Sequence, residues 1–324
     1  MGTAGACAAL GAGAWKFLKP PQGGFLQRTS HALGSDVTMT VWHPDHAAGE
    51  AALDAAFAEL DCIEDVMSLY RPESQLCRLN RERSLESPHP HLVSLLNFAS
   101  ELSAQSEGAF DVTVQPLWNL YRSAAQEGQL PGENAVREAR ACVDWRRVHV
   151  TSERISLSGE GTSITLNGIA QGFAADAAMA VLKRAGVSHA LLDAGEMSAL
   201  GGKPDGGSWR VGIQHPRRPD AFVSLARLQN RCLATSGDYE TRFSDDFRHN
   251  HLFDPHTGHS PTELASVSIA APTATAADAL STAVFVLGVE RGVALVRRTP
   301  GMDALLVLKN GRVIATDGFP LEAV

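Results

Sequence analysis

The stretch SVSIAAPTATAADALSTAVFVLG, residues 266–288, decides how we interpret the fold. It starts as a strand, because apolar Val267 and Ile269 alternate with small residues, and Pro272 ends the strand since it has no N–H to donate. Apolar residues then recur at the spacing of one helical face. These positions are Ala277, Leu280, Val284 and Leu287. The stretch predicts a strand that leads directly into a helix with a buried apolar face.

Oxygen-bearing side chains lie on another flank of the predicted helix. Asp278 and Thr282 are four residues apart, so they stack on one side of the helix, with Ser281 beside them. One carboxylate, hydroxyls and nearby backbone carbonyls suit Mg²⁺, which prefers hard oxygen ligands and keeps several waters. We expect this flank to face solvent. An alternative stays open, because Thr275 and Asp278 have the spacing of a capping box at the helix N-terminus.

Length and composition are those of an ordinary globular protein. The chain has 324 residues, of which 44% are hydrophobic and 20% charged, enough for one large or two smaller domains. The net charge of −8 argues against nucleic acid as a partner, which would favour a basic face. The 5 cysteines are scattered without a CxxC motif, so they form neither a disulfide framework nor a zinc motif.

The first residues have the character of a leader. Residues 3–15 are small and apolar, too short to span a bilayer but similar to the central part of a secretory signal. A basic residue before this run is missing, so we interpret it as a truncated export signal, with a plain apolar terminus as the alternative. We assign residues 1–28 to signal and linker and 29–324 to one domain, in the periplasm or on the inner membrane facing it.

The remaining chain mixes strand and helix patterns, which predicts an α+β fold with mixed sheets and packed helices. Apolar alternation predicts strands at residues 37–42, 148–165 (several short ones), 190–192, 209–213, 222–226, 304–308 and 312–316. Helical periodicity predicts helices at residues 51–67, 91–103 and 173–185.

A histidine-rich segment follows the predicted sheet strands. Four histidines fall within residues 249–259, which raises the possibility of zinc. Pro255 and Gly258 interrupt any helix that would align them, so we favour a role for one of them as a general base near neutral pH.

Taken together, the turns resemble the ApbE family of FAD:protein FMN transferases. The similarity runs from about residue 33 to 316, with the motifs in the family's order. The matching motifs are Met67-Ser68-Leu69-Tyr70-Arg71-Pro72, Gly108-Ala109-Phe110-Asp111, Asn167-Gly168-Ile169-Ala170-Gln171-Gly172, Ser236-Gly237-Asp238-Tyr239, His251-Leu252-Phe253-Asp254-Pro255 and Ala277-Asp278-Ala279-Leu280-Ser281-Thr282.

The resemblance implies an enzyme with an ApbE-like, T-fold-like architecture, and allows two lobes with FAD between them. Such a transferase uses Mg²⁺ and FAD as its substrate, passes FMN to a threonine hydroxyl of a target protein, and releases AMP. The implied partner is a membrane-anchored respiratory flavoprotein. Some members of the family instead hydrolyse FAD, so an FAD pyrophosphatase, an FAD-binding accessory protein without turnover and a purely structural domain stay as alternatives.

The resemblance also assigns roles to individual residues. It implies that Asp278, Thr282, Ser281 and Gly168 bind the metal, the last two through backbone carbonyls. It implies that His251 acts as the base and that Asp278 is catalytic. The residues implied to contact FAD are Leu33, Tyr70, Ala109, Phe110, Asp111, Thr165, Gln171 and Phe253. Three of these depart from the family pattern, which often has Met at Leu33, Asp at Thr165 and Lys at Gln171.

Overall fold

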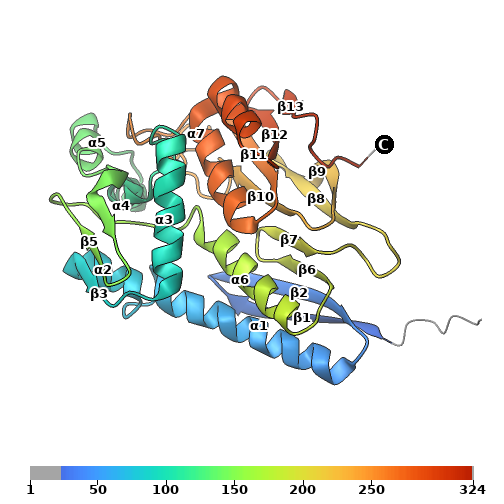
Figure 1. The fold of residues 1–324 in the computed structure, drawn as a ribbon. Coiled ribbons are helices and arrows are strands. Elements are labelled where there is room, and N and C mark those ends of the chain that lie inside the picture. Colours follow the sequence, from blue (N-terminus) through green and yellow to red (C-terminus); the bar gives the residue numbers. More distant parts are fainter. Residues whose placement is uncertain (1–22, 323–324) are drawn as a thin grey trace, which may run out of the picture.

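An eight-stranded antiparallel sheet organises the computed structural model, which describes residues 23–322 (Figure 1). The strand order is β1-β2-β6-β7-β10-β11-β12-β13. The strands are β1 (Gly24–Ala32), β2 (Ser35–His43), β6 (His189–Asp193), β7 (Met197–Leu200), β10 (Cys232–Gly237), β11 (Leu264–Ala271), β12 (Asp303–Leu308) and β13 (Val313–Ala315). The predicted export signal lies outside the described residues, whereas residues 24–28, which we had assigned to the linker, form part of β1.

Two smaller sheets and seven helices complete the described part of the chain. One sheet has the order β3-β5-β4 and the other pairs β8 with β9. Their bounds are β3 (Ser84–Glu86), β4 (Val148–Val150), β5 (Arg154–Leu157), β8 (Trp209–His215) and β9 (Arg218–Leu228). The helices are α1 (His46–Met67), α2 (Gln75–Glu82), α3 (Pro90–Gln105), α4 (Gln115–Gln126), α5 (Glu133–Arg140), α6 (Ala170–Arg184) and α7 (Ala274–Arg298), with short 3₁₀ turns at Val112–Val114 and Trp145–Arg147.

The two faces of the large sheet are buried against different partners. Side chains of successive strand residues point to opposite faces, so Val267 and Ile269 of β11 join the core formed with the helices. Ala270 of the same strand instead packs with Trp209 and Val211 of β8. The helices α1, α6 and α7 therefore cover one face and the β8–β9 hairpin covers the other (Figure 1).

The α+β fold class is confirmed, although the strand pairings within residues 23–322 are antiparallel rather than mixed. The predicted strand-to-helix unit is present as β11 and α7. Several boundaries differ: α1 begins at His46 rather than residue 51, β9 is longer than the strand expected at 222–226, the strands expected up to residue 165 end at Leu157, and α6 begins at Ala170 rather than residue 173. The earlier start places Gln171 and Gly172 in the first turn of α6.

Helix α7 is long and apolar enough to cross a membrane by length and composition. In the structure it is a core helix, since its residues from Ala274 to Phe285 are nearly all buried against the sheet and α6. Its backbone is interrupted at Gly288, which has a φ of 76°. A positive φ of this kind is accessible mainly to glycine, so Gly288 allows the helix to kink.

Candidate metal centre

The N-terminus of α7 is capped by residues that the sequence analysis did not assign to that role. Thr273 accepts a hydrogen bond from the Ala276 N–H, and the Asp176 carboxylate of α6 accepts from the N–H groups of Ala274 and Thr275, both at 2.8 Å. The capping-box alternative for Thr275 and Asp278 is therefore wrong. Asp278 is left free for another function.

Asp278 is buried beneath the first turn of α6. Its side chain is only 5% exposed, and Oδ2 accepts a hydrogen bond of 3.0 Å from the Gly172 N–H. A Cβ on Gly172 would lie 2.8 Å from Asp278 Cβ and would overlap the Ala274 carbonyl, so only glycine allows this approach. The expectation that this flank faces solvent is wrong, because the N-terminus of α6 covers it.

A chain of hydroxyl groups links α7 to the end of β10. Ser281 Oγ donates to the Asp278 carbonyl at 2.8 Å and lies 2.7 Å from Ser236 Oγ, which is 3.2 Å from Thr282 Oγ1. Because the Ser281 proton is used, Ser236 donates to Ser281 and accepts from Thr282. This leaves a lone pair of Thr282 free for a cation. Ser236 lies in one of the matching motifs, but no local pattern connects it with α7.

The loop before α6 completes the group of residues predicted to bind metal. A Cβ placed on Gly168 would lie 3.0 Å from Thr282 Oγ1, so the backbone of this loop directly approaches the hydroxyl. The structure thus brings Asp278, Ser281, Thr282 and Gly168 together from two segments that are distant in sequence. Within residues 23–322 no group of three His, Cys, Asp or Glu side chains is arranged for a metal. The oxygen set fits a hard cation such as Mg²⁺.

The electrostatics at this point are strongly acidic. Burial, and then the negative charge of Asp176, raise the pKa of Asp278 to about 7, although the Gly172 N–H opposes this shift. Burial and the charge of Asp278 raise the pKa of Glu196 well above its usual value. Glu196 was not among the predicted site residues.

The segment Ala109-Phe110-Asp111 lies next to the Gly168 loop. A Cβ on Gly168 would be 3.7 Å from the Phe110 ring, and Ala109 and Phe110 are both buried. Asp111 accepts from the N–H and hydroxyl of Thr113 and from the Trp145 N–H, while burial raises its pKa to about 6. Both carboxylate oxygens of Asp111 thus accept hydrogen bonds from the protein, and these bonds stabilise the turn at Asp111.

Two of the three positions that depart from the family pattern, Thr165 and Gln171, are neutral and hydrogen-bonded to the protein. Thr165 is buried, and its hydroxyl accepts from the Asn167 N–H at 3.2 Å. Gln171 Nε2 donates to the Ala194 carbonyl at 3.3 Å. Neither position contributes a charge near Asp278.

The other residues implied to contact FAD have different surroundings. Tyr70 is 70% exposed. Leu33 is half-buried in a turn with a φ of 55°. Phe253 is buried in an aromatic cluster, with its ring 4.9 Å from that of Tyr121. Tyr70 therefore has a free face for a ligand, whereas Phe253 packs in the interior.

His251 has the protonation state that a general base needs. Its Nδ1 lies 3.2 Å from the Thr241 carbonyl, which can only accept, so Nδ1 carries the proton and Nε2 has a free lone pair. Burial lowers the pKa of His251, which keeps the ring neutral at pH 7. His256 and His259 contact Glu107 and Tyr121 instead, so this segment forms no zinc site within the described residues.

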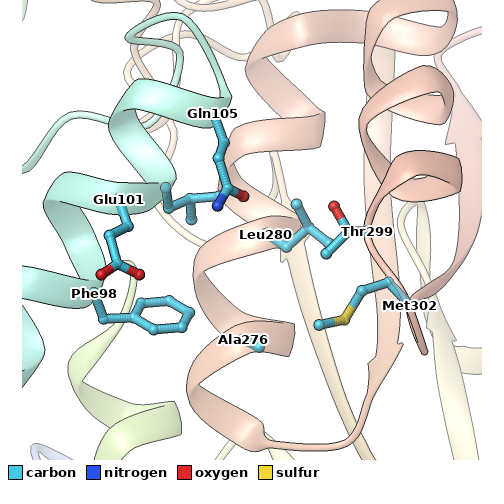
Figure 2. Close-up of a pocket in the computed structure, with 8 residues that line it drawn as sticks. Phe98, Glu101, Gln105, Ala276, Leu280, Thr299 and Met302 are labelled. Carbon is cyan, nitrogen blue, oxygen red and sulfur yellow. The ribbon is translucent and has the colours of Figure 1, made fainter.

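A separate cavity of about 160 Å³ lies between α3 and α7 (Figure 2). Figure 2 shows Phe98 of α3 and Met302 on either side of Ala276 and Leu280 of α7. Ala276 and Leu280 are each two positions from Asp278 or Thr282, which places them on the opposite side of the helix. The cavity is therefore not part of the candidate metal centre.

The fold and this site define an α+β protein with a buried hard-oxygen centre between two helices. The family model described as "ApbE family" matches residues 33–306. An FAD:protein FMN transferase of Treponema pallidum is 34% identical over 315 residues, covering 90% of this chain and 87% of that protein. A protein of the same description from Escherichia coli K12 is 30% identical over 267 residues, covering 78% of this chain and 75% of that protein.

Solved structures agree with these relatives. The apo form of the flavinyl transferase ApbE from Pseudomonas stutzeri has a TM-score of 0.80 at 32% identity, covering 91% of this chain and 96% of that one. The apbe protein of Thermotoga maritima has a TM-score of 0.82 at 28% identity, covering 92% and 100%. The chain belongs to the ApbE family, and it is an enzyme, a transferase.

Proposed function

We propose that this transferase takes FAD as its substrate, uses Mg²⁺, and transfers FMN to a threonine hydroxyl of an acceptor protein with release of AMP. The observation that carries the proposal is the close approach of the Gly168 backbone to Thr282, on the helix flank that also carries the buried Asp278. The names of the relatives support the substrate, since those proteins are described as FAD:protein FMN transferases.

The residues have complementary functions in this reaction. Asp278 and the Thr282 hydroxyl hold the cation, together with the carbonyls of Gly168 and Ser281, and the Ser236 hydroxyl orients Thr282. When bound, Mg²⁺ would neutralise charge on the pyrophosphate. The threonine oxygen forms a bond to the FMN phosphorus as the bond to AMP breaks.

His251 is the base in this scheme. Its Nε2 has a free lone pair because Nδ1 donates to the Thr241 carbonyl. A neutral imidazole accepts the proton of the acceptor hydroxyl, so the lowered pKa of His251 favours this function near pH 7.

We propose a membrane-anchored respiratory flavoprotein as the acceptor and the periplasm as the compartment. The apolar residues 3–15 support this location, since they resemble part of an export signal. The exposed ring of Tyr70 provides a surface on which the flavin can stack.

The test is incubation of the purified chain with FAD, MgCl₂ and a respiratory flavoprotein subunit that carries an acceptor threonine. Mass spectrometry should find one added FMN per acceptor, with an equal amount of AMP, and neither product with EDTA or with a Thr→Val acceptor. Free FMN and AMP without labelling would instead identify an FAD pyrophosphatase. FAD binding without AMP would identify an accessory protein, and no flavin-induced thermal shift would leave only a structural domain.

A further inference from the structure

The turn between β6 and β7 carries an acidic residue, Glu196, and contacts the same turn of α6 as Asp278 does. Ala194 donates through its N–H to the Glu196 carbonyl at 3.1 Å, and the Asp193 carboxylate accepts from the Gly195 N–H at 3.2 Å. The turn rests on the first turn of α6, because Gln171 Nε2 donates to the Ala194 carbonyl. This is the same turn of α6 that donates to Asp278, through Gly172.

One oxygen of the Glu196 carboxylate is buried without a partner. The residue is 8% exposed, and Oε2 has no hydrogen bond to any described residue. A buried carboxylate oxygen that lacks a donor is unfavourable, and such groups persist mainly where they serve a function. The placement of Glu196 therefore indicates a ligand that the protein itself does not supply.

No positive side chain neutralises this region. Among residues 23–322, neither Glu196 nor Asp278 forms an ion pair or hydrogen bond with a lysine, arginine or histidine. The neighbouring Gln171 is an uncharged amide, and the other charges that act on Glu196 are the acidic residues Asp193 and Glu240. A buried pair of carboxylates in such surroundings attracts a cation.

We propose that Glu196 is a second carboxylate of the cation site, and that its charge together with that of Asp278 sets the affinity for a divalent metal ion. The inference rests on the proposed function, because it adds a residue to the same metal centre. Two carboxylates with hydroxyl and carbonyl oxygens suit Mg²⁺ or Mn²⁺. Towards the transfer reaction Glu196 is a positioning residue, since it acts through the cation.

The experiment measures Mn²⁺ binding to the purified full chain by electron paramagnetic resonance at about pH 8, because metal ligands must lose their protons to bind. Glu196→Gln keeps the shape of the side chain and removes its charge. We expect its Kd for Mn²⁺ to rise about 10–100-fold, the range typical of a supporting carboxylate. Glu196→Asp should recover part of the affinity. The matched control is Asp193→Asn, which removes a charge from the same turn and should change the Kd less than about 2-fold.

Thermal unfolding separates this role from a structural one. Without metal, Glu196→Gln should melt at or above the temperature of the wild-type chain, because a buried unpaired charge is removed. The stabilisation by added Mn²⁺ should shrink. A lower melting temperature together with an unchanged Kd would overturn the inference while leaving the proposed function intact. Absence of Mn²⁺ binding by the wild-type chain would overturn the metal-dependent function as well.

Discussion

Replacement of Gly172 by alanine tests whether the contact between α6 and α7 builds the metal centre. The added Cβ would lie 2.7 Å from the Ala274 carbonyl carbon, against 3.4 Å for an ordinary contact. The two helices would have to separate by at least about 0.7 Å in a closely packed interior. The same movement would stretch the hydrogen bond from the Gly172 N–H to Asp278.

The expected change in stability combines two destabilising effects and one stabilising effect. Overpacking costs about 1–3 kcal/mol, loss of a hydrogen bond to a charged acceptor costs about 1.5–3 kcal/mol, and alanine is favoured over glycine in a helix by about 1 kcal/mol. We expect Gly172→Ala to lower the free energy of unfolding by about 2–4 kcal/mol. The displaced Asp278 should also weaken Mn²⁺ binding.

Urea unfolding measures the free energy, and a Mn²⁺ titration of the folded protein measures the site. The control is Gly24→Ala, where nothing lies within 4 Å of the added Cβ, and which should behave like the wild-type chain. Stability within about 0.5 kcal/mol of wild type, as for an ordinary surface substitution, would refute the close approach of the two helices.

Three further predictions concern individual side chains. Asp278→Asn should lower AMP release at least about 100-fold while the protein stays folded in a thermal melt, because a charged metal ligand is lost; turnover within a few-fold of wild type would exclude Asp278 as a ligand. His251→Ala should slow transfer about 10²–10⁴-fold at an unchanged Kd for FAD in fluorescence titrations, whereas a pure affinity defect would argue against a base. Because the pKa of Asp111 is raised to about 6, its stabilising contribution is complete below pH 3.8 and is lost as the pH rises through 6. In urea unfolding, the free energy of unfolding of the wild-type chain should therefore decrease by a contribution on the order of 3 kcal/mol between pH 3.8 and 6, and Asp111→Asn should remove this contribution. The same pH dependence in the variant and the wild-type chain would contradict this.

Local patterns in the sequence predicted the four longest helices of the described residues but not α2, α4 or α5, and they predicted contacts less well. The strand and helix around Pro272 follow from a change of apolar period from two to about 3.6, which depends only on neighbouring residues. The cap of α7 by Asp176 joins residues 98 and 99 positions apart, so no local pattern contains it. The capping box at Thr275 was a reasonable local interpretation that this distant carboxylate overrides.

The candidate site likewise combines features that follow from local sequence with contacts between distant segments. Asp278 and Thr282 were found together because a helix fixes their spacing, but their burial depends on the packing of α6. Ser236 and Glu196 come from a strand end and a hairpin turn, and each becomes part of the site only when the sheet brings its segment to α7 or α6. A buried carboxylate oxygen without a partner is visible only in three dimensions, so the sequence analysis did not assign Glu196 to the site.

The burial of Asp278 and Glu196 connects stability with function in this fold. Both carboxylates lie in a low-dielectric interior without a positive side chain, which disfavours the folded state in the absence of a metal. The same low dielectric strengthens their attraction for a divalent cation, because charge interactions weaken in proportion to the dielectric constant. A cation that binds the folded chain and not the unfolded chain then stabilises the folded state. A lysine at Gln171 would relieve the repulsion within the protein and thereby reduce the attraction for the cation. In the proposed metal centre, the neutral side chain at this position leaves the metal ion itself as the counter-charge of the two acids.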